Sequence, residues 1–368
     1  MGETVNEMKS DSMSAEVHFV PQWPGNPYHA ELAGHLPEAG FHVSPEDRLK
    51  AISRKVSATG KLPEVVHLHA IPRFELSWFV ASRFAMFLYR LHSLRRRGVR
   101  VVWTIHDIYH HESLFPKVEL MISRMLFKWV DATIVHSEAA GKAVEKKWGV
   151  KRGHRCSVIP HGNYIGSYPN SVSAADARTK LGVPQGKSVF LFLGMIRPYK
   201  GVLELIETFK RIADGNVHLL IAGKPISDEL ADGIVAAIGD RRDIQHHLDH
   251  VADAEMQDYL NAADMVLFPY TRALTSGALI LAMSFGRACI APKMGALEDT
   301  LDESGGFLYD PEDANGLRDA MQRALAERAK LDAMGENNLR RAKEWDWSMV
   351  ARMTADVYNR CLSNGIRS

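Results

Sequence analysis

The sequence predicts an α/β protein of two doubly wound domains that face a cleft. Its 368 residues exceed one ordinary core and suit two domains of roughly 150–200 residues each. Short apolar runs alternate with longer segments of helical period, the pattern of a parallel sheet covered by helices on both faces. This pattern runs twice along the chain. We therefore expect a disordered N-terminus at 1–15, one domain at 16–168, a second at 169–345 and a terminal helix at 346–368.

The first domain is expected to begin with a strand at 17–20, which is followed by a loop rich in proline and glycine at 24–27. Helical patterns cover 78–97 and 114–130. Four further apolar runs are predicted strands: 65–70, 99–105, 132–135 and 156–159. The polar segment 164–177 is then predicted to be a linker, because serine, asparagine and proline gather in it.

The second domain repeats the alternation of strands and helices. Its predicted strands are 189–193, 217–222, 265–269 and 288–291. Its predicted helices are 202–213, 253–263 and 277–285, and a last helix, 347–361, follows the aromatic segment Trp345-Asp346-Trp347. Two Rossmann-like domains of this kind bind ligands at the carboxyl ends of their strands, so both sheets should present these ends to one cleft.

Composition narrows the class of protein. The apolar content of 46% and the charged content of 24% are typical of a soluble globular chain. A net charge of +1 gives no field that favours nucleic acid, and three scattered cysteines make neither a disulfide framework nor a zinc site. The N-terminus has no apolar signal segment, and no apolar run reaches the ~18–20 residues that span a bilayer. We expect a cytoplasmic protein that can touch the inner face of the plasma membrane.

One segment carries the strongest chemical signal, Gly194-Met195-Ile196-Arg197-Pro198-Tyr199-Lys200-Gly201. A predicted strand ends at Gly194, and a predicted helix begins after Gly201. Arg197 and Lys200 therefore bring two cations to a helix N-terminus, where backbone N–H groups are also free to bind an anion. A solvated basic turn is the alternative. We expect this segment to bind a diphosphate and to stabilise its charge when it leaves, without a metal ion or another cofactor.

A second segment, Thr275-Ser276-Gly277, also joins a predicted strand end to a helix, some eighty residues later. Thr275 or Ser276 can cap the helix, and Gly277 lets a phosphate approach the backbone. The alternative is a plain helix cap. Tyr270, just upstream, is expected on the donor side as well. Together the two segments indicate a nucleotide-sugar site, and hence a glycosyltransferase.

The chain resembles the GT-B glycosyltransferases over nearly its full length, and among them the bacterial exopolysaccharide mannosyltransferases of the xanthan β-mannosyltransferase type. Four segments carry the resemblance: Asn26-Pro27-Tyr28, His67-Leu68-His69, 194–201, and Ser276-Gly277 followed by Leu281-Ala282-Met283-Ser284-Phe285-Gly286. The resemblance implies an N-terminal acceptor domain, a C-terminal donor domain, and a C-terminal helix that packs back on the N-terminal domain. It also implies a nucleotide sugar as a substrate.

The chain departs from the common retaining members of this family. Many of them carry two glutamates, with seven residues between, before the Ala-Met segment, and here Ala273 and Leu281 occupy those positions. This loss favours the inverting subgroup. The usual arginine directly after Gly194 is replaced by Met195, and we assume that Arg197 takes its place.

An inverting enzyme needs a general base for the acceptor hydroxyl, and the segment 104–112 at a predicted strand end offers four candidates. Our first choice is Glu112 and our second is Asp107. His106 is expected to orient the sugar or a phosphate, and His111 to contact the acceptor. The resemblance supports His106 and the pair His111-Glu112. A metal site or a polar loop would be the alternative for three clustered histidines, but no cysteine partner or zinc motif supports it.

The resemblance assigns further residues to the cleft. Gly223, Lys224 and Val251 are expected at the nucleotide base and ribose, and Glu298 at the ribose or sugar, where a plain helix N-terminal charge is the alternative. His161 is expected on the donor side of the cleft, or else in a structural turn. Asn26 and Tyr28 are expected to contact the acceptor, and a proline-fixed turn is the alternative. All of these residues except Val251 follow a predicted strand.

Two predicted helices mix aromatic and basic residues. The first, 78–97, carries Phe84 and Phe87 beside several arginines, and the second, 114–130, carries Phe127 beside Arg124. They can lie on an anionic membrane, with the aromatic rings inserted, or simply cover the sheet with exposed basic faces.

We therefore expect an inverting, metal-independent transfer of a hexose, first choice mannose from GDP-mannose, to a polyprenyl-diphosphate-linked oligosaccharide for exopolysaccharide. Glucose or glucuronic acid from a UDP donor is the alternative. A non-catalytic assembly partner or a nucleotide-sugar epimerase would be of another class.

Overall fold

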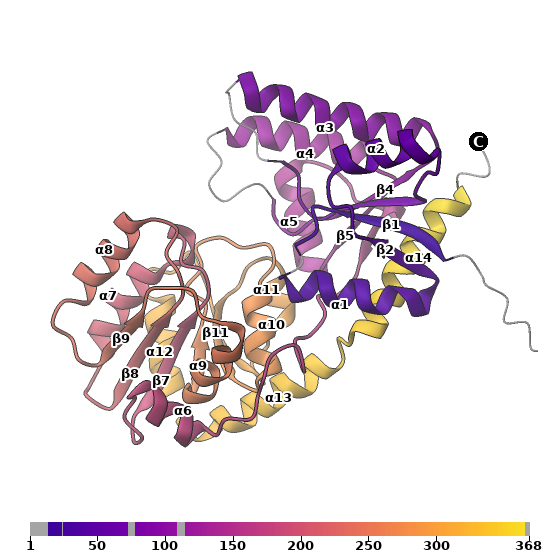
Figure 1. The fold of residues 1–368 in the computed structure, drawn as a ribbon. Helices are drawn as coiled ribbons and strands as arrows, with labels where there is room; N and C mark the ends of the chain where they lie inside the picture. The colour runs from indigo at the N-terminus through magenta and orange to yellow at the C-terminus, as the bar shows by residue number, and fades with distance from the viewer. Residues whose placement is uncertain (1–13, 24, 73–77, 109–114, 365–368) are drawn as a thin grey trace, which may run out of the picture.

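The computed structural model describes residues 14–23, 25–72, 78–108 and 115–364, and it contains two parallel sheets (Figure 1). The first has the strand order β2-β1-β3-β4-β5-β6 and the second β12-β11-β10-β7-β8-β9. Each order reverses direction once from a central strand, as in a doubly wound fold. The prediction of two such sheets is confirmed.

The first sheet is made of short strands, of which β3, β4 and β5 in the centre are almost wholly buried. Its strands are β1 (Ala15–Val20), β2 (Phe41–Ser44), β3 (Val65–Leu68), β4 (Arg100–Thr104), β5 (Ala132–Val135) and β6 (Cys156–Val158). Helices α2 (Leu49–Thr59), α3 (Trp78–Arg96), α4 (Pro116–Trp129) and α5 (Glu138–Trp148) pack on one face, and α1 (Pro27–His35) packs on the other. Continuous Val, Ile and Leu runs form these strands because both faces of the sheet are covered.

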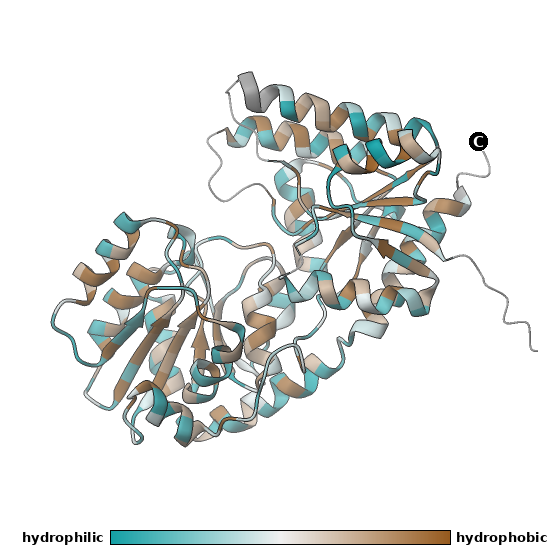
Figure 2. Ribbon diagram, viewed as in Figure 1, coloured by the Kyte–Doolittle hydropathy of each residue, from teal (hydrophilic) through white to brown (hydrophobic). Residues whose placement is uncertain are grey.

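The second sheet is built in the same way. Its strands are β7 (Ser188–Leu193), β8 (Val217–Ala222), β9 (Ile244–His247), β10 (Met265–Leu267), β11 (Ala288–Pro292) and β12 (Gly306–Tyr309). Its helices are α6 (Ala174–Leu181), α7 (Val202–Ile212), α8 (Asp228–Ile238), α9 (Met256–Ala262), α10 (Gly277–Ser284), α11 (Gly295–Thr300), α12 (Gly316–Ala326) and α13 (Leu331–Lys343). Figure 2 shows the hydrophobic residues of these strands enclosed between helices whose outer faces are hydrophilic.

The last helix, α14 (Trp347–Asn364), continues from α13 and leaves the second sheet to pack beside α1 on the first (Figure 1). Tyr358 anchors it there: its ring packs edge-on against Phe41, and its hydroxyl lies 2.7 Å from Nδ1 of His67. Trp347, at the start of the helix, donates its indole N–H to the carbonyl of Asn163 at 2.6 Å. The implied return of the C-terminal helix to the N-terminal domain is thus confirmed.

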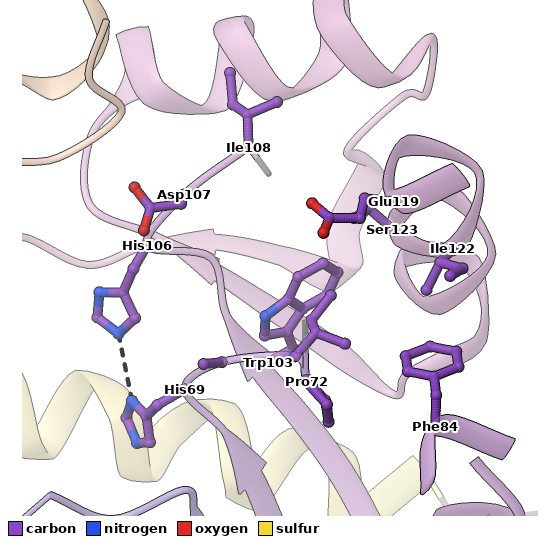
Figure 3. Close-up of a pocket in the computed structure, with 12 residues that line it drawn as sticks. His69, Pro72, Phe84, Trp103, His106, Asp107, Ile108, Glu119, Ile122 and Ser123 are labelled. Atoms are coloured by element: carbon purple, nitrogen blue, oxygen red, sulfur yellow. Dashed lines mark hydrogen bonds between the residues drawn. The ribbon is translucent and has the colours of Figure 1, made fainter. Parts of the chain in front are cut away.

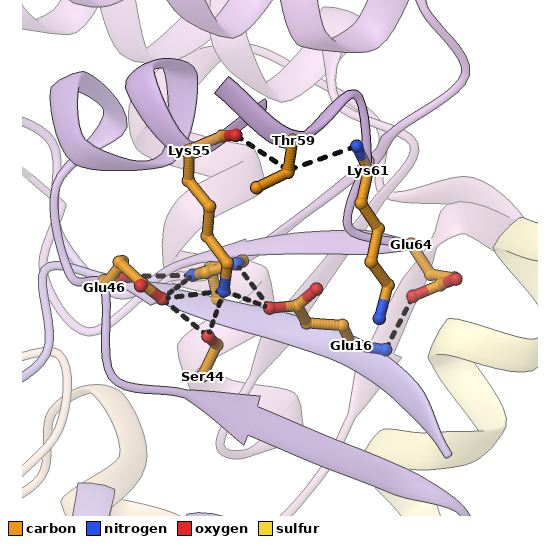
Figure 4. A network of polar contacts seen from close by, with 8 residues as sticks. Glu16, Ser44, Glu46, Lys55, Thr59, Lys61 and Glu64 are labelled. Atoms are coloured by element: carbon orange, nitrogen blue, oxygen red, sulfur yellow. Dashed lines mark hydrogen bonds and ion pairs between the residues drawn. The ribbon is translucent and has the colours of Figure 1, made fainter. Parts of the chain in front are cut away.

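A polar network on the first sheet joins α2 to strands β1 and β2 (Figure 4). The Lys55 ammonium group lies 2.8 Å from Glu16 and 3.2 Å from Glu46, and the Ser44 hydroxyl donates to Glu46 at 2.6 Å. Glu16, His18 and Glu46 lie close enough together to share a metal ion. However, the lysine already supplies the cation between the two carboxylates, so the arrangement acts as a structural ion network.

We expect Lys55→Met to lower the free energy of unfolding at pH 7, because it leaves two carboxylates without their cation. Burial raises the pKa of Glu16, but Lys55, Ser44 and His18 together outweigh it and hold the pKa below 4.5. A lowered carboxyl pKa stabilises the fold above pH ~4.5, and this contribution is lost as the pH falls through the lowered value. The stability gap between the variant and wild type should therefore shrink on acidification.

Urea unfolding at a series of pH values measures this gap. Lys50→Met, at an exposed position on the same helix, is the matched control and should leave the free energy of unfolding nearly unchanged. A gap that stays constant as the pH falls would contradict the assignment.

Candidate functional site

Four histidines mark the edge of the first sheet where its strands end. His69 directly follows β3, His106 lies two residues after β4, His136 directly follows β5 and His161 lies three residues after β6. Because these strands are parallel neighbours, their carboxyl ends meet at one edge and bring the four imidazoles together. The Tyr28 ring lies among them, with ring centroids 5.2 Å from His106 and 4.9 Å from His161.

Three of these histidines form a hydrogen-bonded chain. Nδ1 of His69 lies 3.4 Å from Nε2 of His106, a contact that Figure 3 shows as a dashed line. Nδ1 of His106 lies 3.3 Å from Nε2 of His136, and Nδ1 of His136 lies 3.0 Å from the carbonyl oxygen of Ile159. Both ring nitrogens of His106 are therefore used within the chain.

The carbonyl oxygen of Ile159, at one end of the chain, determines which nitrogen of each imidazole carries the proton. A carbonyl oxygen only accepts, so His136 carries its proton on Nδ1, and its Nε2 accepts from His106. His106 then accepts on Nε2 from His69, whose own Nε2 is left as an acceptor. That atom is buried, and the described residues offer it no hydrogen-bond partner. The assignment requires neutral rings. Burial, followed by the nearby imidazoles, lowers the pKa of His69 and His106 well below the ordinary value.

We expect nitrogen-15 NMR of histidine-labelled protein at about pH 6 to show His136 and His161 neutral, with the proton on Nδ1. Burial lowers the pKa of His136 to about 3 and that of His161 to about 4. His161 donates from Nδ1 to the carbonyl of Gly162 at 2.7 Å. The variants His136→Gln and His161→Gln assign the signals by removing one ring each. A proton on Nε2 of either ring would contradict the chain as described.

The facing edge of the second sheet carries the two cations. Lys200 lies in a short 3-10 turn, Pro198–Lys200, and Gly201, with φ +68°, is the N-cap of α7. The Lys200 ammonium lies 5.5 Å from the centroid of the Tyr270 ring. Burial, and then the charge of Arg197, lowers the pKa of Lys200 to about 8. No carboxylate of the described residues forms an ion pair with Lys200, so an anion bound here would relieve the cost of its burial.

The Thr275-Ser276-Gly277 segment connects both edges. The Ser276 hydroxyl accepts from the N–H of Leu279 at 3.2 Å and so caps α10, while the Thr275 hydroxyl donates to the carbonyl of His106 at 3.1 Å. A side chain on Gly277 would meet the Tyr164 hydroxyl at 3.0 Å and Nε2 of His161 at 3.7 Å. The structure therefore brings the predicted segment against the histidine edge.

Two cavities lie at this junction. One, of about 350 Å³, is lined by both domains, with His136, His161, Thr275 and Ser276 in its wall. A smaller one, of about 70 Å³, lies within the first domain, where Asp107 and Glu119 contribute carboxylates (Figure 3). The Glu119 side chain projects from α4 toward the loop that carries Asp107.

The remaining predicted residues fall into different environments. Gly194 and Gly223 end β7 and β8 side by side, so close that a side chain on Gly223 would meet the Gly194 carbonyl at 2.1 Å. Val251 is buried, whereas Lys224 and Glu298 are exposed, Glu298 in the first turn of α11. Glu112 and His111 lie outside the described residues.

The two residues expected at the acceptor have local roles in the fold. The Asn26 side chain accepts from the N–H of Tyr28 at 3.0 Å and caps α1. Tyr28 is only 4% exposed, and burial raises its pKa although Thr104 hydrogen-bonds to it. Its ring packs against the imidazoles of His106 and His161.

Sequence reasoning did not single out His69, His136 or Glu119 as individual site residues. The available signal for the first two was their position: each directly follows a buried strand, as His106 nearly does. Glu119 gave no such signal, because a glutamate in the first turn of a helix is ordinary.

Comparison with known proteins identifies the class. Residues 187–327 match the family model described as glycosyl transferases group 1, and residues 11–163 match that of glycosyltransferase family 4. The two models match the two halves of the chain, so the protein is a glycosyltransferase, an enzyme that transfers a sugar, and its fold is that of the GT-B enzymes.

The individual proteins compared below share no more than 25% of their residues with this chain. The chain is 25% identical over 300 residues to a GDP-mannose:glycolipid 4-beta-D-mannosyltransferase of Xanthomonas campestris, which covers 78% of this chain and 76% of that protein. It is 22% identical to a D-inositol 3-phosphate glycosyltransferase of Kineococcus radiotolerans, covering 82% of this chain and 72% of that protein. Among solved structures, sucrose-phosphate synthase from Thermosynechococcus elongatus aligns with a TM-score of 0.76 at 20% identity, over 95% of this chain and 100% of that one. Anabaena HepE in complex with UDP and glucose aligns with 0.72 at 16% identity, over 94% and 100%.

Proposed function

We propose that this glycosyltransferase moves mannose from GDP-mannose, with inversion, onto a lipid-linked oligosaccharide for exopolysaccharide. The observation that carries the transfer is that the segment which caps α10 with Ser276 also contacts the histidine edge, because Thr275 donates to the carbonyl of His106. Lys200, near Tyr270, supplies the cation on the same side of the second sheet. The choice of mannose and of a lipid-linked acceptor is supported by the name of the Xanthomonas relative.

Inversion is supported by the residues at the two positions where many retaining enzymes carry glutamate. Leu281 packs in the apolar core and Ala273 lies against it, so neither position offers a carboxylate to the sugar. In a single displacement, the acceptor oxygen attacks the anomeric carbon, the bond to the diphosphate breaks, and the acceptor proton passes to a base. Lys200 and Arg197 stabilise the departing charge. Asp107, exposed beside His106 in the cleft loop, and Glu112 stay the candidate bases.

A lipid-linked acceptor also suits the outer face of α3 and α4, which cover the first domain far from the second sheet (Figure 1). Met86 and Tyr89 of α3, and Met121 and Met125 of α4, are between 43% and 66% exposed. Exposed Arg124 and Lys128 lie on the same helix as the second pair. Apolar side chains among cations are typical of a surface that binds anionic lipid.

Three phenylalanines that the membrane alternative would insert into the bilayer are instead buried. Phe84, Phe87 and Phe127 are buried in the core, where their rings fill the space between the helices and the sheet. The methionines and Tyr89 take the exposed positions instead. None of the described helices is long and apolar enough to span a bilayer.

The donor is tested by thermal unfolding with GDP, UDP, ADP and dTDP at matched concentration, because a ligand of the folded state raises the melting temperature. A selective shift with GDP supports the proposal, and a selective shift with UDP would replace mannose by a UDP-sugar. Proton NMR of the product, made with the preferred donor, then reads its anomeric configuration. A retained configuration would contradict the inverting mechanism.

The acceptor surface is tested by sedimentation with vesicles that contain anionic lipid. The double variant Met121→Ser and Met125→Ser should reduce binding. Val235→Ser, at an exposed apolar position on α8 of the other domain, should not. Equal binding by both variants would remove this support for a lipid-linked acceptor.

A further inference from the structure

A second polar cavity lies at the opposite end of the first sheet, where strands β4 and β5 begin. It has a volume of about 220 Å³. Three arginines from separate parts of the chain line it: Arg100 at the start of β4, Arg155 just before β6 and Arg360 on α14. Since catalysis is expected at the carboxyl ends of the strands, this cavity has no part in the site described above.

Each of the three guanidinium groups is held by a contact of its own. Arg155 donates to the carbonyl oxygens of Lys128 and Val130 at 3.3 and 3.2 Å. Arg360 donates to the Ser157 hydroxyl at 2.7 Å, and Arg100 lies 3.8 Å from Asp131. Arginines held in place have already lost much of their side-chain freedom, so a ligand that binds them loses little more.

The charges around the cavity do not balance. Asp131 is the single carboxylate among the described residues of its lining, against three arginines. That carboxylate is also shared, because it accepts from the N–H of Val101 at 2.8 Å and pairs with Arg95 at 3.3 Å. Cys361, which also lines the cavity, adds no negative charge because burial raises the pKa of its thiol to about 11.

We propose that this cavity binds a phosphate group of a small phosphorylated compound. A doubly charged anion would match the excess of positive charge, and its oxygens would accept from several guanidinium N–H groups at once. A bound phosphate would connect Arg360 of α14 with Arg100 and Arg155 of the sheet. It would thereby tie the C-terminal helix, which continues from the donor domain, to the acceptor domain. The inference does not depend on the donor or acceptor proposed above.

The test is the affinity for inorganic phosphate, measured from thermal unfolding at constant ionic strength with chloride as the reference salt. Because phosphate would also bind beside Lys200, every protein carries Lys200→Ala. We expect a saturable phosphate shift in this background and a loss of affinity of about tenfold or more in Arg360→Gln. Arg352→Gln, an exposed arginine on α14 outside the lining, should keep the shift.

Two results would overturn the proposal. One is the absence of a phosphate-specific shift in the Lys200→Ala background, and the other is an equal shift with and without Arg360. Arg100→Gln provides a second variant in case Arg360→Gln unfolds. A lipid headgroup is an alternative source of phosphate, so vesicle binding by Arg360→Gln is also measured. Unchanged vesicle binding supports a soluble ligand, and its loss would overturn that assignment.

Discussion

We expect Lys200→Ala to lower kcat by about 10²- to 10³-fold while the free energy of unfolding changes little or rises. The ammonium group lies near the Tyr270 ring at the end of the second sheet, where negative charge would develop on the departing diphosphate. A fixed cation at this place stabilises the transition state more than the bound donor. Its removal should not destabilise the fold, because the ammonium is buried next to Arg197 and no described carboxylate pairs with it.

Steady-state kinetics with the donor found by thermal unfolding would measure this loss. Lys210→Ala is the matched control: Lys210 lies on α7, ten residues along, and within the described part of the chain it forms one ion pair, with Glu207. Its kcat should stay near that of wild type. If Lys200→Ala also kept a near wild-type kcat, the diphosphate assignment would be wrong.

The same lysine predicts a pH dependence. Burial, followed by Arg197, lowers the pKa of Lys200 to about 8, so in the free enzyme the ammonium loses its proton as the pH rises through that value. The affinity for a nucleoside diphosphate should therefore fall above about pH 8 in the wild-type protein. In Lys200→Ala this part of the pH profile should be flat, which calorimetry at several pH values would show.

The long apolar strands and the two-sheet plan were predictable because burial on both faces leaves a continuous hydrophobic run. Strands β2, β9 and β12 were missed. Each has only four residues; β2 and β9 carry histidine or other polar side chains, and β12 begins with glycine. The two segments proposed to bind phosphate could be singled out because glycine and either cations or a capping hydroxyl follow a predicted strand end. Of the histidine chain, the sequence singled out only His106. The other two histidines reach it because β3, β4 and β5 are neighbours in the sheet, and this order cannot be derived from the sequence.

The sequence also did not show which faces of two helices point to the core. In 78–97 and 114–130 apolar residues occur around most of the helix, so the period did not tell which aromatic residues face the core. The sheet decides this: Phe84 and Phe87 fill the space above β3 and β4, and Met86 and Tyr89 are left outside. Asn26 shows a similar limit of sequence analysis. An asparagine can cap a helix or contact a ligand, and the structure shows that this one caps α1.

Gly223→Ala is expected to destabilise the protein by about 3 kcal/mol. Gly223 has φ +142°, which residues with a side chain rarely adopt. An added Cβ would also lie 2.1 Å from the carbonyl oxygen of Gly194, which is backbone and has no room to move. Relief requires β7 and β8 to separate where they end, and that would shift the segment that carries Arg197 and Lys200.

Gly233→Ala provides the matched control, because Gly233 lies within α8 and an added Cβ would have nothing within 4 Å. It should stabilise the protein by about 0.5–1 kcal/mol, since glycine is unfavourable inside a helix. Urea unfolding would measure both variants, and nucleotide affinity would be compared with that of wild type. If both glycines tolerated alanine equally, the close approach of the two strand ends would be refuted. If Gly223→Ala lost nucleotide affinity more than folding stability, the spacing of these strand ends would be what positions the cations for the diphosphate.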